Sequence, residues 1–316
     1  MSTNTVKRKM NKNTLSPMLK KQEQQCFLML SLQLIGFIVF TIYPIAWAIR
    51  YAWFYYTGAP EATRFTGLEN FIQIFTKDAT YWKSWITTFK FALFKLPVEL
   101  PLAMIIALLL NKKYKGNNFF RAIYCLPNII SVAIVGLIIS TLFDYFGFMN
   151  VFLEKIGLIK KPIDWFANTG TAMAVLVIGG TWSTFGINVL YFLAALANVP
   201  EELYESAHLD GANKFVMFFK ITLPMMAPVL QTILLLSING TLQTNDYILV
   251  TTNGAPGGTT YTVMSYIVQK FVPGFASVNE VVNVGYGCAL ALVTSIILGT
   301  IAFVYSKLSN KLNNLY

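Results

Sequence analysis

Charged side chains are scarce in this 316-residue chain. They make up 12% of it, against about 25% in a typical soluble domain. Hydrophobic residues make up 55% and are gathered into long runs. Five runs contain no Lys, Arg, Asp or Glu: 26–49, 122–143, 169–199, 221–245 and 281–306. A spanning helix needs about 20 apolar residues, so each run is long enough. The sequence predicts an all-α polytopic membrane protein, because these runs lack the alternation of β-barrel strands.

A sixth span, about 84–110, is less apolar because it contains Lys90, Lys95 and Glu99. Lys95 and Glu99 lie four residues apart, so they share one face of a helix. We expect a paired couple that lowers the cost of burying both charges. The alternative is a proton relay, since intramembrane acids often mark ion pathways. We favour the structural pair, because a relay usually needs more than one such acid. Six transmembrane helices are therefore predicted.

Histidine and cysteine are also scarce, which bears on enzyme and metal chemistry. His208 is the only histidine, and the three cysteines are scattered through apolar runs at Cys26, Cys125 and Cys288. This pattern gives no metal site, no disulfide framework and no cluster of catalytic residues. No G-x-x-x-x-G-K-[ST] phosphate loop is present either. We therefore expect no catalytic residues and no bound cofactor, and any ATP used in transport must be hydrolysed by another chain.

The basic residues predict how the chain is oriented. The net charge is +10, and the side that would hold both termini carries about twice as many Lys and Arg residues as the other. By the positive-inside rule, both termini and the 198–224 loop lie in the cytoplasm. The expected parts are a cytoplasmic tail over 1–25, a transmembrane domain over 26–308 and a short tail over 309–316. The positive charge suits contact with anionic membrane lipid rather than nucleic acid.

A charged helical insert separates two of the apolar runs. Pro200 suits the first turn of a helix, and Gly211 can take the left-handed conformation that ends it. A second short helix would then carry Phe215, Phe218 and Phe219. Two short helices at an angle, one acidic and one rich in phenylalanine, are typical of a docking element for a partner. The alternative is an ordinary interfacial loop.

The insert resembles the EAA motif of ABC importer permeases, in the pattern E-S-A-x-x-x-G-x₉-I-x-L-P from Glu205 to Pro224. The run "VPEELYESAHLDGANKFVMFFKITLP" is similar to the carbohydrate-uptake branch, as are "FTGLENF", "FFRAIYCLPNIIS", "FGFMNVFLEKIGL" and "TNGAP", which occur in the family's order. One departure is Ser206, where the family usually has alanine. The resemblance covers most of residues 30–305 and implies a type I importer permease in a bacterial inner membrane.

The resemblance also implies partners and a coupling site. Such a permease pairs with a second, homologous permease and with two cytoplasmic subunits that bind ATP and Mg, and it receives sugar from an extracellular binding protein. The loop would dock in a cleft of one ATPase subunit. The residues expected to couple the two are Glu205, Ser206, Ala207, Asp210, Gly211, Phe218 and Phe219.

Polar residues within the apolar runs form candidate sugar contacts. Asn239, Gln243 and Asp246 are spaced at i, i+4 and i+7, which would place them on one helical face. Thr184, Asn188 and Tyr191 repeat that spacing, beside the aromatic rings of Trp182 and Phe185, and Asn128 and Ser131 follow Pro127. Amides and a carboxylate match sugar hydroxyls, whereas the alternative is a set of ordinary interhelical hydrogen bonds. The family resemblance implies a sugar site at Asn128, Thr184, Asn239, Gln243 and Asp246, with the partner permease completing it.

Two other functions remain open from the sequence. An ABC permease for a different solute, such as an amino acid or phosphate, would share the EAA motif. A secondary transporter often shows inverted repeats and several ionisable groups at mid-membrane. No internal repeat stands out here, so we consider the secondary transporter the weaker alternative.

Overall fold

The computed structural model describes residues 17–111, 116–271 and 282–313. The chain divides into two compact units, Met1–Tyr51 and Ala52–Tyr316. Among the described residues, five helices are long and apolar enough to cross a membrane, or six if one sharply bent pair counts as a span. The prediction of a polytopic helical protein is confirmed. Most of the two predicted tails, at 1–16 and 314–316, lies outside the described residues.

The first unit is one long apolar helix with a widened turn. It comprises α1 (Pro17–Phe37), a π-helical turn η2 (Ile38–Ile42) and α2 (Tyr43–Tyr51). Pro44 follows the wide turn closely and has no N–H for the carbonyl four residues earlier. A π turn moves the proline ring away from that carbonyl, so the helix continues without a break.

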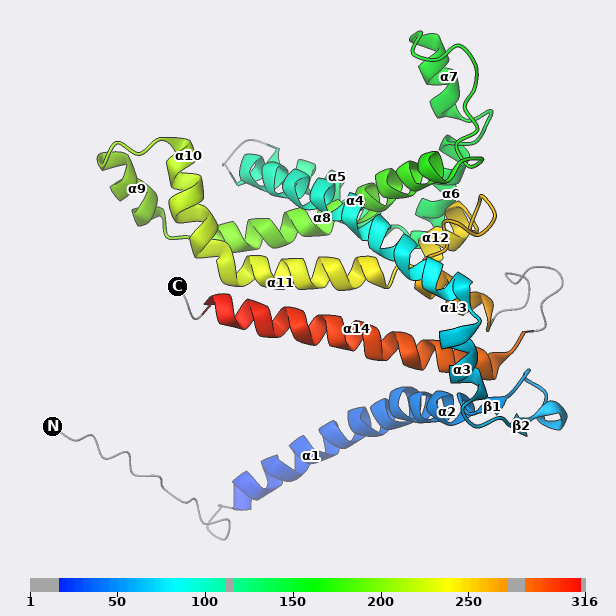
Figure 1. Ribbon diagram of the computed structural model, residues 1–316. Coiled ribbons are helices and arrows are strands. Elements are labelled where there is room, and N and C mark those ends of the chain that lie inside the picture. The colour runs from blue at the N-terminus through cyan, green and yellow to red at the C-terminus, as the bar shows by residue number, and fades with distance from the viewer. Residues whose placement is uncertain (1–16, 112–115, 272–281, 314–316) are drawn as a thin grey trace. The chain divides into compact units, whose positions relative to one another are not determined.

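Four long helices build the second unit (Figure 1). They are α4 (Ala79–Leu110), α8 (Thr169–Ala197), α11 (Leu223–Leu242) and α14 (Val284–Asn313). The span that ends with α11 begins earlier, at Lys214, and passes through the π-helical turn η4 (Phe218–Thr222). These helices match four of the predicted spans, including the weaker one over 84–110.

The predicted span 122–143 is not one helix. It is formed by α5 (Asn117–Ile129) and α6 (Val132–Leu142), whose axes differ by 93°. Pro127 remains inside α5, and the break falls at Ile130, whose ψ of 141° is extended. The bend therefore comes three residues after the proline and not at the proline itself. Close packing holds α5 in place, because a Cβ at Gly186 of α8 would collide with the backbone of α5 at Tyr124.

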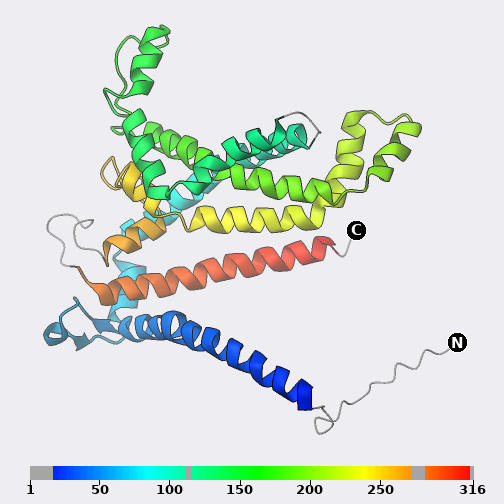
Figure 2. The ribbon, with the colours of Figure 1, turned by 180° about the vertical axis from the view of Figure 1, so that it is seen from behind.

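The remaining elements gather at the two ends of the second unit. One end holds an antiparallel pair of strands, β1 (Phe54–Tyr55) and β2 (Arg64–Phe65), and the short helices η3 (Pro60–Ala62), α3 (Glu69–Thr76), α7 (Phe148–Lys155), α12 (Asp246–Thr251) and α13 (Val263–Gln269). The other end holds α9 (Glu201–Leu209), α10 (Lys214–Met217) and the C-terminal end of α14 (Figures 1 and 2). We call α9, α10 and the turn between them the arm.

Asp78 fastens helices together at the end that holds α7. Its carboxylate accepts the Tyr81 N–H at 2.8 Å, which caps the first turn of α4. It also accepts the phenol of Tyr266 on α13 at 2.8 Å and the phenol of Tyr286 on α14 at 2.6 Å. One carboxylate thus joins three helices through charge-assisted hydrogen bonds.

Two apolar clusters form the core of the second unit. One, nearer the arm, includes Ala107, Phe192 and Met226, and the other, nearer α7, includes Phe91, Leu176 and Ile248. Along α4, the charged pair Lys95 and Glu99 falls between the residues that belong to these two clusters. The polar centre of the molecule is therefore enclosed by apolar packing on both sides.

Candidate functional site

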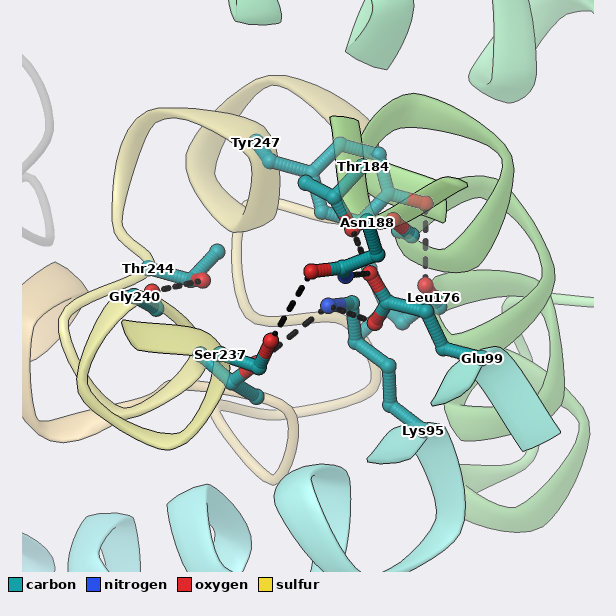
Figure 3. A network of polar contacts seen from close by, with 11 residues as sticks. Lys95, Glu99, Leu176, Thr184, Asn188, Ser237, Gly240, Thr244 and Tyr247 are labelled. Atoms are coloured by element: carbon teal, nitrogen blue, oxygen red, sulfur yellow. Dashed lines mark hydrogen bonds and ion pairs between the residues drawn. The ribbon is translucent and has the colours of Figure 1, made fainter. Parts of the chain in front are cut away.

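The centre of the site is the ion pair between Lys95 and Glu99 on α4 (Figure 3). The Lys95 ammonium lies 2.5 Å from Oε2 of Glu99, and the two residues are 4% and 1% exposed. The prediction of a paired couple is confirmed. Burying two charges requires further hydrogen bonds to both groups, because their mutual attraction alone does not offset the lost hydration.

Neighbouring helices supply those hydrogen bonds (Figure 3). Oε1 of Glu99 accepts the Thr184 hydroxyl at 2.6 Å and the Asn188 amide at 2.7 Å, both from α8. Lys95 donates to the Thr241 hydroxyl of α11 at 3.2 Å. The Asn188 carbonyl oxygen in turn accepts the Ser237 hydroxyl of α11 at 3.1 Å. This network, which we call the Glu99 network, joins α4, α8 and α11.

A cavity of about 460 Å³ opens beside the Glu99 network. This is within the range of about 300–1,000 Å³ that is usual for small-molecule sites. Its lining includes the network residues together with hydroxyl, amide, carboxylate and aromatic groups from α8, α12 and the link between α11 and α12: Ser183, Tyr191, Thr244, Asn245, Asp246 and Tyr247. Burial raises the pKa of Tyr247, so its phenol stays protonated and donates to the Leu176 carbonyl at 3.1 Å.

Thr184, Asn188, Tyr191 and Asp246 are the predicted sugar contacts that line this cavity. Thr184 and Asn188 already donate to Glu99, so much of their hydrogen-bonding capacity is used within the protein. Asp246 is exposed and starts α12. Asp246 therefore lines the cavity from the first turn of a helix, where the helix dipole stabilises a negative charge.

Asn239 and Gln243 lie elsewhere, contrary to the expectation of one face shared with Asp246. Helix α11 ends at Leu242, so the helical spacing does not extend to Asp246. The two amides bond to each other at 2.7 Å. They line a separate groove of about 350 Å³ along α11, α13 and α14, with Met264, Thr294 and Leu298.

The other predicted contacts lie outside the described lining of the cavity. Asn128 and Ser131 are separated by the break between α5 and α6, so they do not share a helical face. Phe185 packs edge-on against Tyr124, with ring centroids 5.6 Å apart. Trp182 is 37% exposed on another side of α8. For these four residues, the predicted sugar contact has no support from the geometry.

Sequence reasoning missed the hydroxyl groups on and just after α11. Ser237 and Thr241 of α11, and Thr244 after its end, line the cavity and repeat the i, i+4, i+7 spacing that drew attention to the neighbouring amides. Serine and threonine are common in spanning helices, where they usually bond to the backbone of their own helix. Thr244 does so, whereas the partners of Ser237 and Thr241 are Asn188 and Lys95 on other helices. The spacing alone did not separate the two cases.

The arm has the predicted two-helix form. Helix α9 ends in a Schellman motif, in which the Ala212 N–H bonds to the Ala207 carbonyl at 2.9 Å and Gly211 has a φ of 75°. The Asn213 side chain then accepts the Val216 N–H at 2.9 Å and caps α10. The prediction that Gly211 takes the left-handed conformation is confirmed. Its Cβ position is open, so the conformation rather than space requires glycine there.

The arm and the start of the adjoining η4 present acidic and aromatic side chains to their surroundings. Glu205 and Asp210 are exposed, and so are Phe215 at 76% and Phe219 at 55%. Phe218 is half-buried and Ala207 is buried. Ser206 donates to the Glu202 carbonyl of its own helix at 2.9 Å, so serine is accommodated where the family usually has alanine. An exposed apolar patch next to carboxylates is typical of a surface that binds another protein.

Comparison with known proteins identifies the family that shares this architecture. The model of a family described as "Binding-protein-dependent transport system inner membrane component" matches residues 99–312. The chain belongs to this family. It is a multi-pass permease of the inner membrane. The matched residues include the arm and most of the Glu99 network and of the cavity lining, whereas Phe91 and Lys95 lie just before the match.

Individual permeases agree with this assignment. The probable ABC transporter permease protein YesP of Bacillus subtilis is 32% identical, over 88% of this chain and 87% of its own length. The arabinooligosaccharides transport system permease protein AraP of the same organism is 33% identical, over 87% and 85%. The lactose transport system permease protein LacF of Rhizobium radiobacter is 31% identical, over 75% and 81%.

The permease also has the fold of a solved transporter chain. A chain in the crystal structure of a bacterial ABC transporter that imports the polysaccharide alginate superposes with a TM-score of 0.78. The match covers 94% of this permease and 99% of that chain, at 22% sequence identity. The type I importer fold expected from the sequence is therefore confirmed.

Proposed function

We propose that this permease forms half of the translocation path of an ATP-driven importer of sugars or oligosaccharides. Its relatives support this function, since their names specify arabinooligosaccharides, lactose, and trehalose or maltose. The observation that carries the proposal is the cavity beside the Glu99 network, because polar side chains line it although it lies among spanning helices.

The chemistry of the cavity suits an uncharged, polyhydroxylated solute. The charge of Lys95 is neutralised by Glu99 at 2.5 Å. The remaining polar groups of the lining are hydroxyls, amides and the Asp246 carboxylate, which can exchange hydrogen bonds with sugar hydroxyls. The rings of Tyr191 and Phe91 supply apolar surface for the faces of a pyranose. The compensated lysine argues against a phosphate site, which usually presents free cationic groups.

The arm supports a coupling role at the opposite side of the bundle from α7. Glu205, Ser206, Ala207, Asp210, Gly211, Phe218 and Phe219 would form the face that docks on a cytoplasmic ATPase subunit. Two such subunits would bind ATP and Mg, a second homologous permease would complete the cavity, and an extracellular binding protein would deliver the sugar. ATP binding can drive transport only if it favours one arrangement of the helices over another.

The topology follows from the same proposal. The arm and the C-terminal end of α14 lie at one end of the second unit (Figure 1), so a cytoplasmic arm would place the C-terminus in the cytoplasm. The excess of basic residues assigns the N-terminus to the same side.

An uptake assay with the complete transporter tests the function. The permease would be reconstituted in vesicles with its partner permease, the ATPase subunits and the binding protein. We expect ATP-dependent uptake of labelled maltose or of an arabinooligosaccharide, and no uptake of glutamine or phosphate. Uptake of glutamine or phosphate alone would identify a permease for another solute. Sugar uptake driven by an ion gradient without the ATPase subunits would identify a secondary transporter.

A further inference from the structure

A hydrogen bond between two side chains joins the arm to the start of α11. The Tyr204 phenol of α9 lies 2.9 Å from the Thr222 hydroxyl in η4. Thr222 is 4% exposed, and the Tyr204 ring packs against the apolar cluster that includes Phe192 and Met226. This contact therefore lies at the base of the arm, between its exposed surface and the core.

The direction of the hydrogen bonds follows from a second contact of Thr222. Its hydroxyl lies 3.3 Å from the Met217 carbonyl, to which it donates. A hydroxyl has one hydrogen to donate and two lone pairs. Tyr204 is therefore the donor to Thr222, and Thr222 passes the chain of hydrogen bonds on to the backbone where α10 meets η4. The Tyr204 phenol, the Thr222 hydroxyl and the Met217 carbonyl thus form a short chain of hydrogen bonds beside the widened turn.

Besides the packing of the Tyr204 ring on the core, two chain connections join α9 to the rest of the permease. One is the segment Asn198–Pro200, where Pro200 has an extended ψ of 133°. The other is the turn at Asp210–Asn213, which contains Gly211 in the left-handed conformation. Single-residue changes of φ and ψ at such positions are the usual basis of hinges. The Tyr204–Thr222 hydrogen bond adds a third link, which restrains rotation about both.

The Tyr204–Thr222 hydrogen bond connects the arm to the helix that lines the cavity. Thr222 immediately precedes α11, and α11 carries Ser237 and Thr241 of the Glu99 network. A displacement of α9 that is transmitted through Thr222 therefore reaches the cavity along one continuous helix, about four to five turns away at 3.6 residues a turn. A loose arm would instead absorb the displacement within its own turns.

We propose that Tyr204 and Thr222 are positioning residues for energy coupling, because their hydrogen bond makes the arm and α11 move as one body. This inference rests on the proposed function of the permease as a subunit of an ATP-driven importer. Neither residue is exposed enough to be a main docking contact, since Tyr204 is half-buried and Thr222 is buried. They act on transport through the rigidity of the arm.

Tyr204→Phe tests the proposal by removing one hydroxyl while keeping the ring that packs on the core. In the reconstituted transporter, we expect the ATPase subunits to copurify as with the wild type. The number of sugar molecules taken up per ATP hydrolysed should fall about 2- to 10-fold, the factor that corresponds to the net free energy of one hydrogen bond. Thr222→Val should lower this ratio similarly, and Thr222→Ser, which keeps the hydroxyl, should restore most of it.

Tyr305→Phe is the matched control. The Tyr305 phenol on α14 donates to the Gln231 carbonyl on α11 at 2.7 Å. The control therefore also removes one interhelical hydrogen bond of a tyrosine, but one that does not involve α9. It should leave the uptake-to-ATP ratio within twofold of the wild type. The double variant Tyr204→Phe/Thr222→Val should resemble the worse single variant, because both remove the same link.

Two outcomes would overturn the proposal. An unchanged uptake-to-ATP ratio in Tyr204→Phe would show that the hydroxyl has no part in coupling. Loss of the ATPase subunits from purified Tyr204→Phe would show that the residue serves docking or assembly instead. A wild-type transporter that takes up no sugar with ATP would contradict the proposed function itself, so the two failures are distinguishable.

Discussion

Two pairs of polar residues with the same helical spacing have different surroundings in this permease. Thr184 and Asn188 on α8 point at the buried carboxylate of Glu99 and donate to one oxygen at 2.6 and 2.7 Å. Asn239 and Gln243, on and just after α11, are exposed and bond to each other at 2.7 Å. The first pair reduces the free-energy cost of burying the Glu99 carboxylate. The second pair leaves its remaining donors and acceptors open to a groove. The spacing of polar residues shows which face they share, but the group opposite decides what they do.

The largest expected effect comes from removing the charge that organises the first pair. Glu99→Ala would leave Lys95 buried without a counter-ion, which typically destabilises a protein by about 3–5 kcal/mol. We expect a strong loss of folded permease on heating in detergent. The double variant Lys95→Met/Glu99→Leu should recover much of that loss, because it removes both charges. A double variant less stable than Glu99→Ala would show that the ion pair stabilises the bundle beyond satisfying its own charges.

A smaller loss of stability is expected when a single member of each pair is replaced by alanine. Asn188→Ala removes one donor to a buried carboxylate, and hydrogen bonds to charged groups contribute about 1.5–3 kcal/mol. Gln243→Ala removes a hydrogen bond between exposed amides, for which about 0.6 kcal/mol is typical within membranes. Thermal unfolding of the two variants side by side measures the difference. Equal losses of stability would contradict the distinction between the two pairs.

The smallest expected effect is on the sugar concentration for half-maximal uptake, and it tests whether sugar contacts the cavity or the groove. Asp246→Ala removes an exposed carboxylate from the cavity lining. Loss of one charge-assisted hydrogen bond to sugar, about 1.5 kcal/mol, would raise the sugar concentration for half-maximal uptake about tenfold. Gln243→Ala, which changes the groove, should alter it less. If Gln243→Ala impairs uptake as much as Asp246→Ala, the sugar path runs along the groove beside α13 and α14.

Much of the fold could be predicted from local patterns. Four of the five runs without charge form continuous spans, because the bilayer sets a minimum length for an apolar helix. The pairing of Lys95 with Glu99 follows from their spacing, and the conformation of Gly211 follows from its place after a charged short helix. Each of these features depends on residues of a single helix or turn, so the local sequence contains the whole signal.

The missed features depend on contacts between distant segments. The break at Ile130–Ser131 has no proline or glycine at its centre and is accompanied by packing of α6 on α12, where a Cβ at Gly136 would lie 3.0 Å from Val250. The partners of Thr184 and Asn188 lie 85 and 89 residues away in the chain. The end of α11 at Leu242 likewise precedes a run of polar residues that a continuing helix could also have accommodated. Tertiary packing between segments that are distant in the sequence determines all three features.

The widened turn η4 has a consequence for how this permease can tolerate changes of length. A π turn contains about one residue more than an α turn, and successive helical residues differ by about 100° in direction. Deleting one residue within Phe218–Thr222 would give a regular helix and leave the cavity contacts of α11 intact. Because the wide turn completes about one full turn with its extra residue, the arm would keep nearly the same direction around the axis of α11. The same deletion in a regular part of the helix would turn the arm by about 100° and present another side to its surroundings. The wide turn ahead of Pro224 is thus the place where this span can lose one residue without rotating the arm.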